Sequence, residues 1–395
     1  MKKSLFALAA MGAFAGAVQA QSSVTVYGIV DESVMSSQTK ATNGTKVTND
    51  AIQSGAASTS RLGFRGVEDL GGGLTASFTA EAGMNGASSS SGLLSTSATS
   101  GNRQTFVSLS QKGIGAVSGG YMVTDTHSVR ATNDPFGGMN LPGNPIVSVT
   151  LGNIAASQTI ATNLYPVIGG ASATVAGGTA TNQDYTLRAP LVGFTTAPIA
   201  GVTLTYQRIQ ANAVSTTSSN VETPTRANGN TVGARYTFGK LNVLASYNDM
   251  TNQTLITGTN NNRTVKNTTI GANYDFGVAR IYATYANDQM KFDDATLANA
   301  NDVKNTNAQI AVQAPIGAVT LRAGYTSGKY TLGRSGGGSG LGGARDTSGY
   351  QAGVFYGFSK RTDLYAVYGS QSRKVINTLV DATDTAYAVG VRHTF

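Results

Sequence analysis

The chain has 395 residues, with 28 Lys and Arg against 20 Asp and Glu, a net charge of +8 and a mean hydropathy of −0.09. It has no Cys, which excludes disulfide bonds and thiolate metal sites, and its basic residues are too scattered for a nucleic-acid interface. No charged linker or change in composition divides the chain, so one domain is expected despite its length.

The first twenty residues are typical of an export signal. Lys2 and Lys3 precede an apolar, alanine-rich stretch, and Ala20 supplies the small residue that signal peptidase needs. The apolar stretch is too short to cross a bilayer as a helix, which takes ~20 residues. We therefore expect residues 1–20 to be a cleaved signal peptide and residues 21–395 to form the exported domain, with the net charge reduced to +6.

Sixteen short segments follow in which apolar residues alternate with small or polar ones. Such a two-residue period is typical of strands with lipid on one face and water on the other. Because no other apolar run is long enough for a spanning helix, a membrane location requires a β-barrel. In chain order the segments are Val24–Met35, Ser60–Gly66, Leu74–Met84, Arg103–Ser110, Ala116–Thr124, Asp184–Leu191, Val202–Gln210, Thr231–Phe238, Leu241–Met250, Val265–Phe276, Ala279–Met290, Thr306–Gln313, Ala318–Ser327, Ser348–Phe358, Asp363–Gln371 and Asp384–Phe395.

The connections between these segments alternate in length. Short ones, of two to seven residues, contain Gly, Pro or Asp, whereas long ones such as Ser36–Thr59 are rich in Asn, Thr, Ser and Gly. Outer-membrane barrels have this layout, with short periplasmic turns and long extracellular loops. The pattern predicts an all-β protein, a 16-stranded antiparallel transmembrane β-barrel with both termini on the periplasmic side.

Arginines on the second segment are expected to face the lumen. Leu62 and Phe64 share one phase of the alternation and are assigned to lipid, which turns Arg61 and Arg65 inward. An arginine pointed at hydrocarbon costs ~2–4 kcal/mol at mid-membrane, so the inward assignment is favoured energetically.

Two further arginines are assigned to the lumen in the same way. On the fourth segment Phe106 is placed on the lipid side and Arg103 inside, and on the sixth Tyr185 and Leu187 are placed on lipid and Arg188 inside. Together the four arginines predict a positive strip on one wall of the pore. The alternative is that each is an ordinary solvated lumen residue or pairs with a neighbouring carboxylate.

The connection formed by residues 125–183 is exceptionally long. A structureless stretch of this length inside a compact fold is expected only where it is functional or disordered. In a barrel such a loop has a physical use, which is to fold inward and narrow the lumen. We therefore interpret residues 125–183 as a constriction loop, the third long loop of the barrel.

The closing segment alternates up to the last residue. Tyr387, Val389, Val391, His393 and Phe395 share one phase, and the residues between them are small or polar. A strand that ends on an aromatic residue fits the closing strand of an outer-membrane barrel. Because the chain has no Trp, an aromatic belt at the membrane interface must use its 17 Tyr and 13 Phe.

Four stretches carry a family resemblance: Ser23–Asp31, Ser60–Leu74, Arg103–Leu109 and Gly390–Phe395. They are similar to the general bacterial porins of Gram-negative outer membranes, most of all to the β-proteobacterial branch. The resemblance implies a homotrimer embedded in outer-membrane lipid that lets small hydrophilic solutes and inorganic ions diffuse passively. It also implies that the last strand, with Val391, His393 and Phe395, is read by the outer-membrane assembly machinery.

The resemblance extends to the pore constriction, where Arg61, Arg65 and Arg103 match family arginines. The family's third loop usually has an acidic residue between Pro and Phe in a Pro-acid-Phe-Gly-Gly motif. Here Pro135 is followed directly by the turn residues Phe136, Gly137 and Gly138, and the acid comes before the proline.

The loop acids Asp125 and Asp134 are therefore the candidates for an acidic wall opposite the arginines, the alternative being turn or cap residues. Relatives often have Arg in the fifth strand, where this chain has Ser118 followed by two glycines. Arg130, in the loop, is the candidate to replace that charge.

The leading functional hypothesis is a general porin with a mild anion preference, because strips of Arg in a pore favour anions. The alternatives are a substrate-selective channel on the same fold and an exported adhesin. An enzyme is not expected, since hydrolytic chemistry needs a base such as His and the two histidines, His127 and His393, are not expected to share a site. No cofactor and no metal site are expected.

Overall fold

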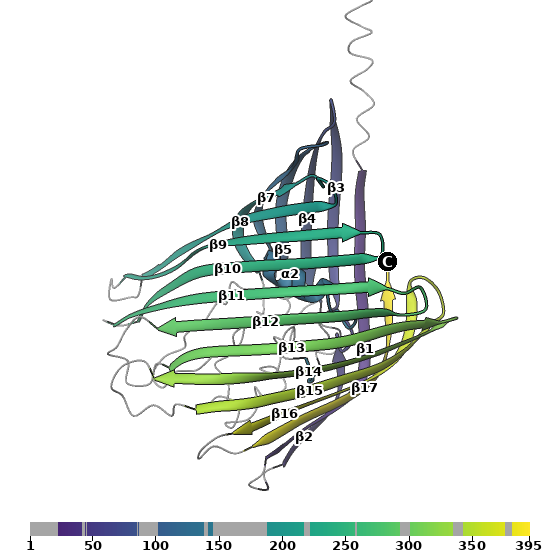
Figure 1. The fold of residues 1–395 in the computed structure, drawn as a ribbon. Coiled ribbons are helices and arrows are strands. Elements are labelled where there is room, and N and C mark those ends of the chain that lie inside the picture. Colours follow the sequence, from purple (N-terminus) through teal and green to yellow (C-terminus); the bar gives the residue numbers. More distant parts are fainter. Residues whose placement is uncertain are drawn as a thin grey trace, which may run out of the picture.

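The structure is a computed structural model of the whole chain, shown as a ribbon in Figure 1. It describes residues 23–41, 44, 46–84, 86, 102–137, 141–144, 188–216, 222–256, 259–292, 301–334, 343–375 and 381–395. The predicted signal peptide and residues 138–140 and 145–183 of the predicted constriction loop lie outside the described residues.

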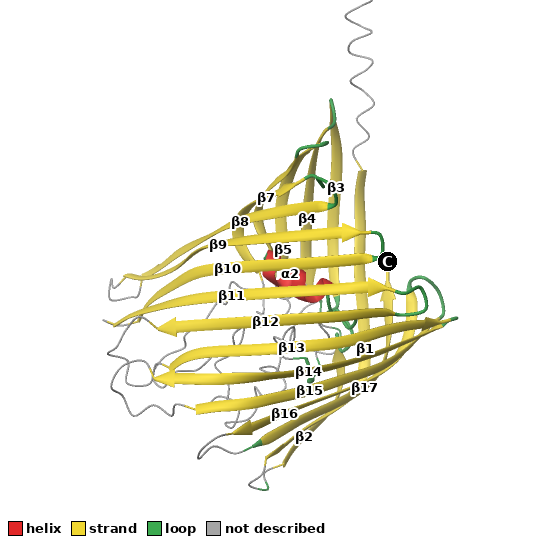
Figure 2. Cartoon of the chain, viewed as in Figure 1, coloured by secondary structure: helices red, strands yellow, loops and turns green. Residues whose placement is uncertain are grey.

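Antiparallel strands form one closed wall (Figures 1 and 2). Apart from β2 and β3, strands that are neighbours in the sequence pair with each other, and the first strand pairs with the last, which closes the ring. The strands are β1 (Ser23–Ala41), β2 (Lys46–Ser54), β3 (Arg61–Gly71), β4 (Leu74–Gly83), β5 (Asn102–Gln111), β6 (Gly115–Val123), β7 (Arg188–Thr196), β8 (Val202–Thr216), β9 (Glu222–Phe238), β10 (Leu241–Ile256), β11 (Thr259–Asp275), β12 (Arg280–Phe292), β13 (Asn301–Ile316), β14 (Val319–Arg334), β15 (Gly343–Gly357), β16 (Thr362–Val375) and β17 (Ala382–Thr394).

The second barrel strand is built in two pieces. Both β2 and β3 pair with β1, β2 with its second half and β3 with its first half, and the segment Gly55–Ser60 separates them. The described strands therefore make the predicted sixteen-stranded antiparallel β-barrel, which is confirmed.

The prediction of a long loop over Ser36–Thr59 is wrong in part. β1 continues to Ala41, and Lys46–Ser54 returns along it as β2. This hairpin is rich in Ser, Thr, Asn and Gln, because strands need apolar residues only where they face lipid. Its backbone hydrogen bonds form without the apolar alternation on which the sequence prediction depended.

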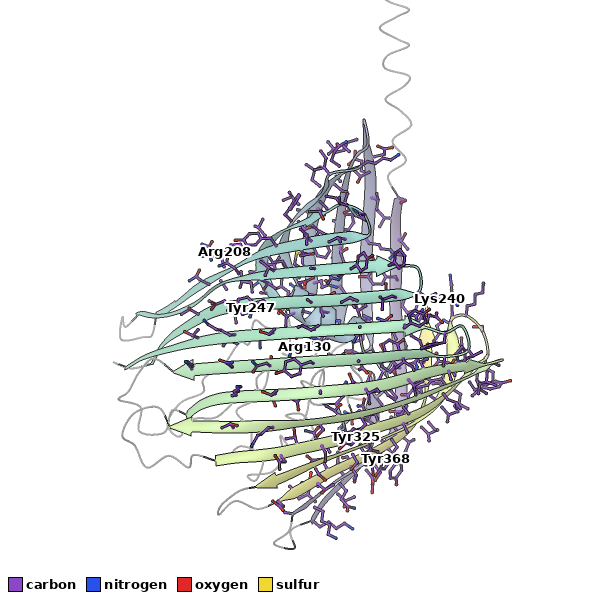
Figure 3. All side chains as sticks on the ribbon, in the orientation of Figure 1. Arg130, Arg208, Lys240, Tyr247, Tyr325 and Tyr368 are labelled. Carbon is purple, nitrogen blue, oxygen red and sulfur yellow. The ribbon has the colours of Figure 1, made fainter. Side chains whose placement is uncertain are left out.

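The two faces of the wall differ in chemistry. Inward positions hold small or polar buried side chains such as Ser246 and Thr269, and outward positions hold exposed apolar ones such as Ile270. Tyr247 and Tyr325, labelled in Figure 3, lie on the outward phase of β10 and β14. A continuous exposed apolar surface of this kind is unfavourable in water and matches a lipid-facing wall.

Aromatic side chains form pairs at the rim with the short turns. Tyr236 and Phe238 stack with ring centroids 6.3 Å apart, and Tyr274 and Phe276 meet edge to face at 4.6 Å. These rings take the place that tryptophans hold in other interfacial belts, as the composition predicts.

The described part of the third loop starts with a helix, α2 (Asp125–Thr132), which lies inside the barrel (Figure 2). It packs on the inner faces of β9, β10 and β11. Thr124 caps its start, since the threonine side chain accepts a hydrogen bond from the backbone N–H of His127. No helix in the described residues is long and apolar enough to cross a membrane.

The loop continues from α2 to an apolar cluster on the inner wall. Phe136 and Leu141 are buried there with Met35, Ala56, Ala57, Phe355, Tyr365, Val367, Ala386 and Ala388. Gly324 and Gly353 border the Phe136 ring, since a Cβ at these positions would be in ordinary van der Waals contact with it, at 3.6 and 3.4 Å. Residues 125–137 thus have the inward fold that was predicted for this loop.

Candidate functional site

Three of the predicted pore arginines gather on the inner wall where β1, β3, β4 and β5 adjoin. Arg103 Nε lies 2.7 Å from Glu81 Oε1, and Glu81 also accepts a 3.1 Å hydrogen bond from the Tyr27 hydroxyl. The Arg65 guanidinium lies 5.3 Å from the centre of the Tyr27 ring, and Arg61 interacts electrostatically with Arg103 and Glu81. The structure therefore brings Arg61, Arg65 and Arg103 together on one side of the lumen.

Arg188 also lies near this group, although it is not on the inward phase of its strand as was predicted. β7 runs from Arg188 to Thr196, and its buried inward residues are Ala189 and Leu191, whereas Val192 is 58% exposed on the outer face. Arg188 is on the outward phase at the end of the strand, yet it interacts electrostatically with Arg103, Glu81 and Arg61. The predicted lipid-facing Tyr185 and Leu187 lie outside the described residues.

The phase predicted for the fourth barrel strand is also wrong. Val107 and Leu109 are the exposed outward residues, and Phe106 shares the inward phase of its cross-strand partner Thr79. Arg103 still reaches the lumen because the register between β4 and β5 shifts at this point. A bulge inserts an extra residue and re-aims the side chain. We call Arg61, Arg65, Arg103 and Arg188 the arginine wall.

His127 on α2 faces the arginine wall. Burial, followed by the charges of Arg188, Arg130 and Arg103, lowers the pKa of its imidazole to about 3. The ring is therefore neutral at ordinary pH and adds no positive charge to the lumen. It can instead offer one hydrogen-bond donor and one acceptor.

Arg130 belongs to the attachment of the loop rather than to the open pore. Its guanidinium forms a salt bridge with Asp288 on β12, and its Nε donates a 2.9 Å hydrogen bond to Thr269 on β11. The side chain is almost fully buried. Because breaking a buried pair leaves an unpaired charge, this contact holds α2 against the wall. Arg130 is therefore not available to replace, in the open pore, the arginine that relatives often have in the fifth strand.

Asp125, a predicted acidic residue of the eyelet, is buried between α2 and the wall. It forms a salt bridge with Arg235 on β9, and its backbone N–H donates a 2.7 Å hydrogen bond to Gln207. Burial raises the pKa of its carboxyl, and Arg235 opposes that rise. Gly233 makes this approach possible, because a Cβ there would collide with Asp125 Oδ2. The carboxylate therefore does not face the open lumen.

Asp134 is buried as well, at the turn that follows α2. Its Oδ1 accepts hydrogen bonds from Gln309 on β13 and from the backbone N–H of Phe136, each 3.3 Å long. Pro135 and Phe136 are buried in this turn, and Gly137 takes a φ of +62° there. Asp134 thus acts as a turn residue, which was the alternative to a place in the acidic wall of the pore. Gly138 lies outside the described residues.

A sequence model of a protein family described as Gram-negative porin matches residues 7–375. The chain belongs to this family. It is therefore an outer-membrane protein of the porin class, which confirms the resemblance noted in its strands.

Two curated porins match parts of the chain. Outer membrane porin protein 32 of Delftia acidovorans is 53% identical over 78 residues, 20% of this chain and 21% of the relative. An outer membrane porin protein of Bordetella pertussis strain Tohama I is 34% identical over 150 residues, 35% of this chain and 37% of the relative. The matched stretches thus span well under half of either relative.

Solved structures match over nearly the whole chain. The anion-selective porin from Comamonas acidovorans has a TM-score of 0.65 and 25% identity, covering 95% of this chain and 100% of the other. The OmpF complex of Salmonella typhi with daunomycin has a TM-score of 0.59 and 16% identity, covering 94% and 97%. The second match bears on the fold alone.

The porin lumen contains a second basic pair that was not predicted from the sequence. Arg322 on β14 lies 4.1 Å and Arg392 on β17 lies 5.8 Å from the centre of the Phe355 ring. Arg392 also forms a 2.8 Å salt bridge with Asp363. The inward phase of each strand was a readable signal for these residues, but only the barrel register shows that they share one aromatic ring.

The porin barrel closes on its last residue. Gly28 and Phe395 exchange two backbone hydrogen bonds of 3.1 Å, and a Cβ at Gly28 would collide with the Phe395 ring. Val391, His393 and Phe395 are exposed on the outer face, which is the phase predicted for them. Their part in assembly stays a prediction.

Proposed function

We propose that this porin forms a water-filled channel through which small hydrophilic solutes and inorganic ions diffuse passively, with a preference for anions. The arrangement that carries the proposal is the arginine wall. Three of its guanidinium groups interact electrostatically around the single carboxylate of Glu81. Basic side chains lining a pore raise the local concentration of anions and favour their passage.

The contacts of the loop acids Asp125 and Asp134, and of Asp288 on β12, support the same preference. Asp125 and Asp288 are committed to salt bridges with Arg235 and Arg130, and Asp134 is buried in a turn. Negative charge on the loop side is thus held in contacts with the wall and contributes little field to the water. The matched Comamonas acidovorans porin is itself described as anion-selective.

The test is a reversal-potential measurement on the purified protein in planar bilayers with a potassium chloride gradient. We expect a potential of the sign that marks chloride as the more permeant ion, and a smaller potential in Arg103→Gln, which removes one charge of the arginine wall. A matched control is Lys240→Gln, which removes one positive charge from an exposed turn. A cation preference in the unaltered protein contradicts the proposal.

We further propose a homotrimer that is exported by a signal peptide ending at Ala20 and inserted through recognition of the strand that ends at Phe395. Support comes from family membership and from the outward, exposed terminal strand. N-terminal sequencing of the mature protein should start at Gln21. Electrophoresis without heating should give a band at the trimer mass that boiling converts to monomer.

A further inference from the structure

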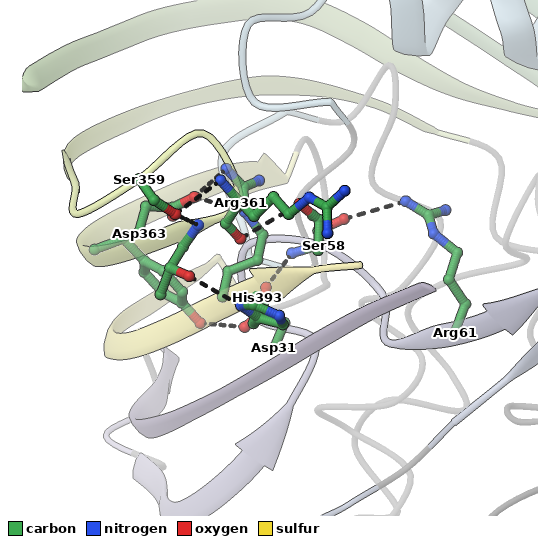
Figure 4. Close-up of polar contacts among 11 residues, drawn as sticks. Asp31, Ser58, Arg61, Ser359, Arg361, Asp363 and His393 are labelled. Atoms are coloured by element: carbon green, nitrogen blue, oxygen red, sulfur yellow. Dashed lines mark hydrogen bonds and ion pairs between the residues drawn. The ribbon is translucent and has the colours of Figure 1, made fainter. Parts of the chain in front are cut away.

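The break in the second barrel strand is tied to one buried residue of β1, Asp31. The backbone N–H of Gly55 donates a 2.8 Å hydrogen bond to the Asp31 carbonyl, and the N–H of Ser58 donates a 2.6 Å bond to Oδ2 of the Asp31 side chain. The N–H of Asp31 in turn donates a 3.0 Å bond to Ser60 Oγ. Three bonds thus fix Gly55–Ser60 at its start, middle and end. Figure 4 shows Ser58 beside Asp31.

The fixed segment lies on the inner side of the wall. Ala56 is 1% exposed and Ala57 is 4% exposed, and both pack in the cluster that contains Phe136 and Leu141 of the third loop. These residues therefore occupy part of the barrel lumen. Gly55–Ser60 is a second inward fold, in contact with the cluster that anchors the first.

Asp31 is held from the other side as well. It is 0% exposed, and the Tyr365 hydroxyl on β16 donates a hydrogen bond to its Oδ1. A buried carboxylate that loses its donors keeps the desolvation cost without compensation. The donors and the carboxylate therefore stabilise one another. Because Tyr365 lies on the other side of the β1–β17 pairing that closes the barrel, the position of Ser58 depends on a contact made across that closure.

Arg61 is the first residue after this segment. Its Nη2 donates a 3.4 Å hydrogen bond to Ser58 Oγ, as Figure 4 shows. The side chain of one arginine of the pore wall is thus connected through Ser58 to the Asp31 carboxylate.

We infer that Asp31 is a positioning residue for ion selectivity: it holds Gly55–Ser60 in the lumen as a second constricting element and fixes Arg61 beside it. This inference rests on the proposed function, in which the arginine wall sets the ion preference. Without the Asp31 contacts the segment can move outward toward the line of the strand, which widens the pore and lets Arg61 leave its place.

The test uses Asp31→Asn in the full-length protein, with single-channel conductance and reversal potential as readouts. Loss of a negative charge near the pore would by itself increase the preference for anions. Asn keeps the backbone bonds to Gly55 and Ser60 but has one oxygen acceptor in place of two, so the side-chain contact with Ser58 or with Tyr365 is lost. Loss of that positioning contact has the opposite sign: conductance rises and the reversal potential shifts toward the cation side. The matched control is Asp384→Asn, a buried inward carboxylate on β17 that accepts a 2.7 Å hydrogen bond from Thr39. It should show the charge effect alone.

Two uncharged substitutions keep the inference testable if Asp31→Asn does not fold. Tyr365→Phe removes the donor to Asp31, and Ser58→Ala removes the acceptor for Arg61; both should shift the reversal potential toward the cation side. In an Arg61→Gln background, Ser58→Ala should cause no further shift, because its effect passes through Arg61.

The outcomes separate the two proposals. A rise in anion preference at unchanged conductance in Asp31→Asn overturns the positioning role, as does a full additional shift by Ser58→Ala in the Arg61→Gln background. An unaltered protein without anion preference overturns the proposed function. A conductance increase in Asp31→Asn would then still show that the segment constricts the pore.

Discussion

At the scale of single residues, His127 shows how the pore environment decides a charge. Its imidazole lies near three arginines, so protonation would add a cation beside Arg188, Arg130 and Arg103. The pKa falls from 6.5 to about 3, with burial as the largest cause. A cation-rich wall therefore keeps its histidine neutral, as expected when burial and like charge both disfavour the protonated form.

This lowered pKa predicts a pH dependence of stability. In the unfolded chain the imidazole takes up a proton below a pH of about 6.5, whereas folded His127 does so only near pH 3. Between these two values the unfolded chain binds more protons than the folded one, so the folded protein loses stability as the pH falls from 6.5 toward 3. His127→Gln should narrow the difference between the unfolding temperatures at pH 7 and pH 4, measured by circular dichroism. His393→Gln, at the exposed rim, should leave that difference as in the unaltered protein. Equal differences in all three proteins would contradict the prediction.

The sequence indicated which residues carry charge but not where their partners lie. Asp125 meets Arg235 and Asp134 meets Gln309, contacts between positions more than a hundred residues apart. Local patterns do not specify such pairs, so both acids were candidates for the open lumen, with a turn or cap role as the alternative. The arginines of β3 could be given a face from the sequence, because the exposed Phe64 marks the outward phase of that strand.

At the scale of secondary-structure elements, the closing contact between β1 and β17 depends on a missing side chain. Gly28 is where the Phe395 ring rests, and the two residues exchange both backbone hydrogen bonds. Closure of the last strand onto the first removes the two open edges that a sheet would otherwise present. The ring of Phe395 then covers the seam from the lipid side.

Gly28→Ala should interfere with closure, because its Cβ would collide with the Phe395 ring. We expect a smaller fraction of refolded, heat-modifiable barrel than for the unaltered protein, measured by electrophoresis with and without boiling. Gly119→Ala is the matched control, since a Cβ on that strand glycine would meet its nearest neighbour, Val192, at 4.0 Å. Equal refolding yields for the two variants would contradict the role assigned to Gly28.

Strand existence was predictable and strand phase was not always so. β5 carries Phe106 on one phase and Val107 and Leu109 on the other, so the alternation alone does not say which face meets lipid. The register shift near Arg103 then separates the arginine from the phase of its strand. The β1–β2 hairpin escaped prediction for a different reason, since strands beyond the lipid need no apolar face.

At the scale of the whole molecule, the ring of strands follows from a simple requirement. A chain whose alternating segments face lipid must satisfy every backbone hydrogen bond within the wall, which only a closed barrel achieves. The signal-like start, the sixteen segments and the short turns therefore predicted the architecture. The break at Gly55–Ser60 was not predictable, because it depends on contacts of Asp31 across the finished seam.

The proposed anion preference should depend on salt. Fixed charges act over a screening length of ~10 Å at 0.1 M salt and ~3 Å at 1 M. With the ratio of the two salt concentrations held constant, the reversal potential should be larger in dilute than in concentrated potassium chloride. A potential that does not change with salt would assign the selectivity to pore size rather than to the field of the arginine wall.

The third loop does more than occupy the pore, because its described part is fastened along one arc of the wall. From α2 on β9–β11 it proceeds through Arg130 on β12 and Asp134 on β13 to Phe136 and Leu141, where Gln351 of β15 donates to the Leu141 carbonyl. A thin cylinder resists flattening where such a brace is attached. We therefore expect shape fluctuations of the channel to be smallest along this arc.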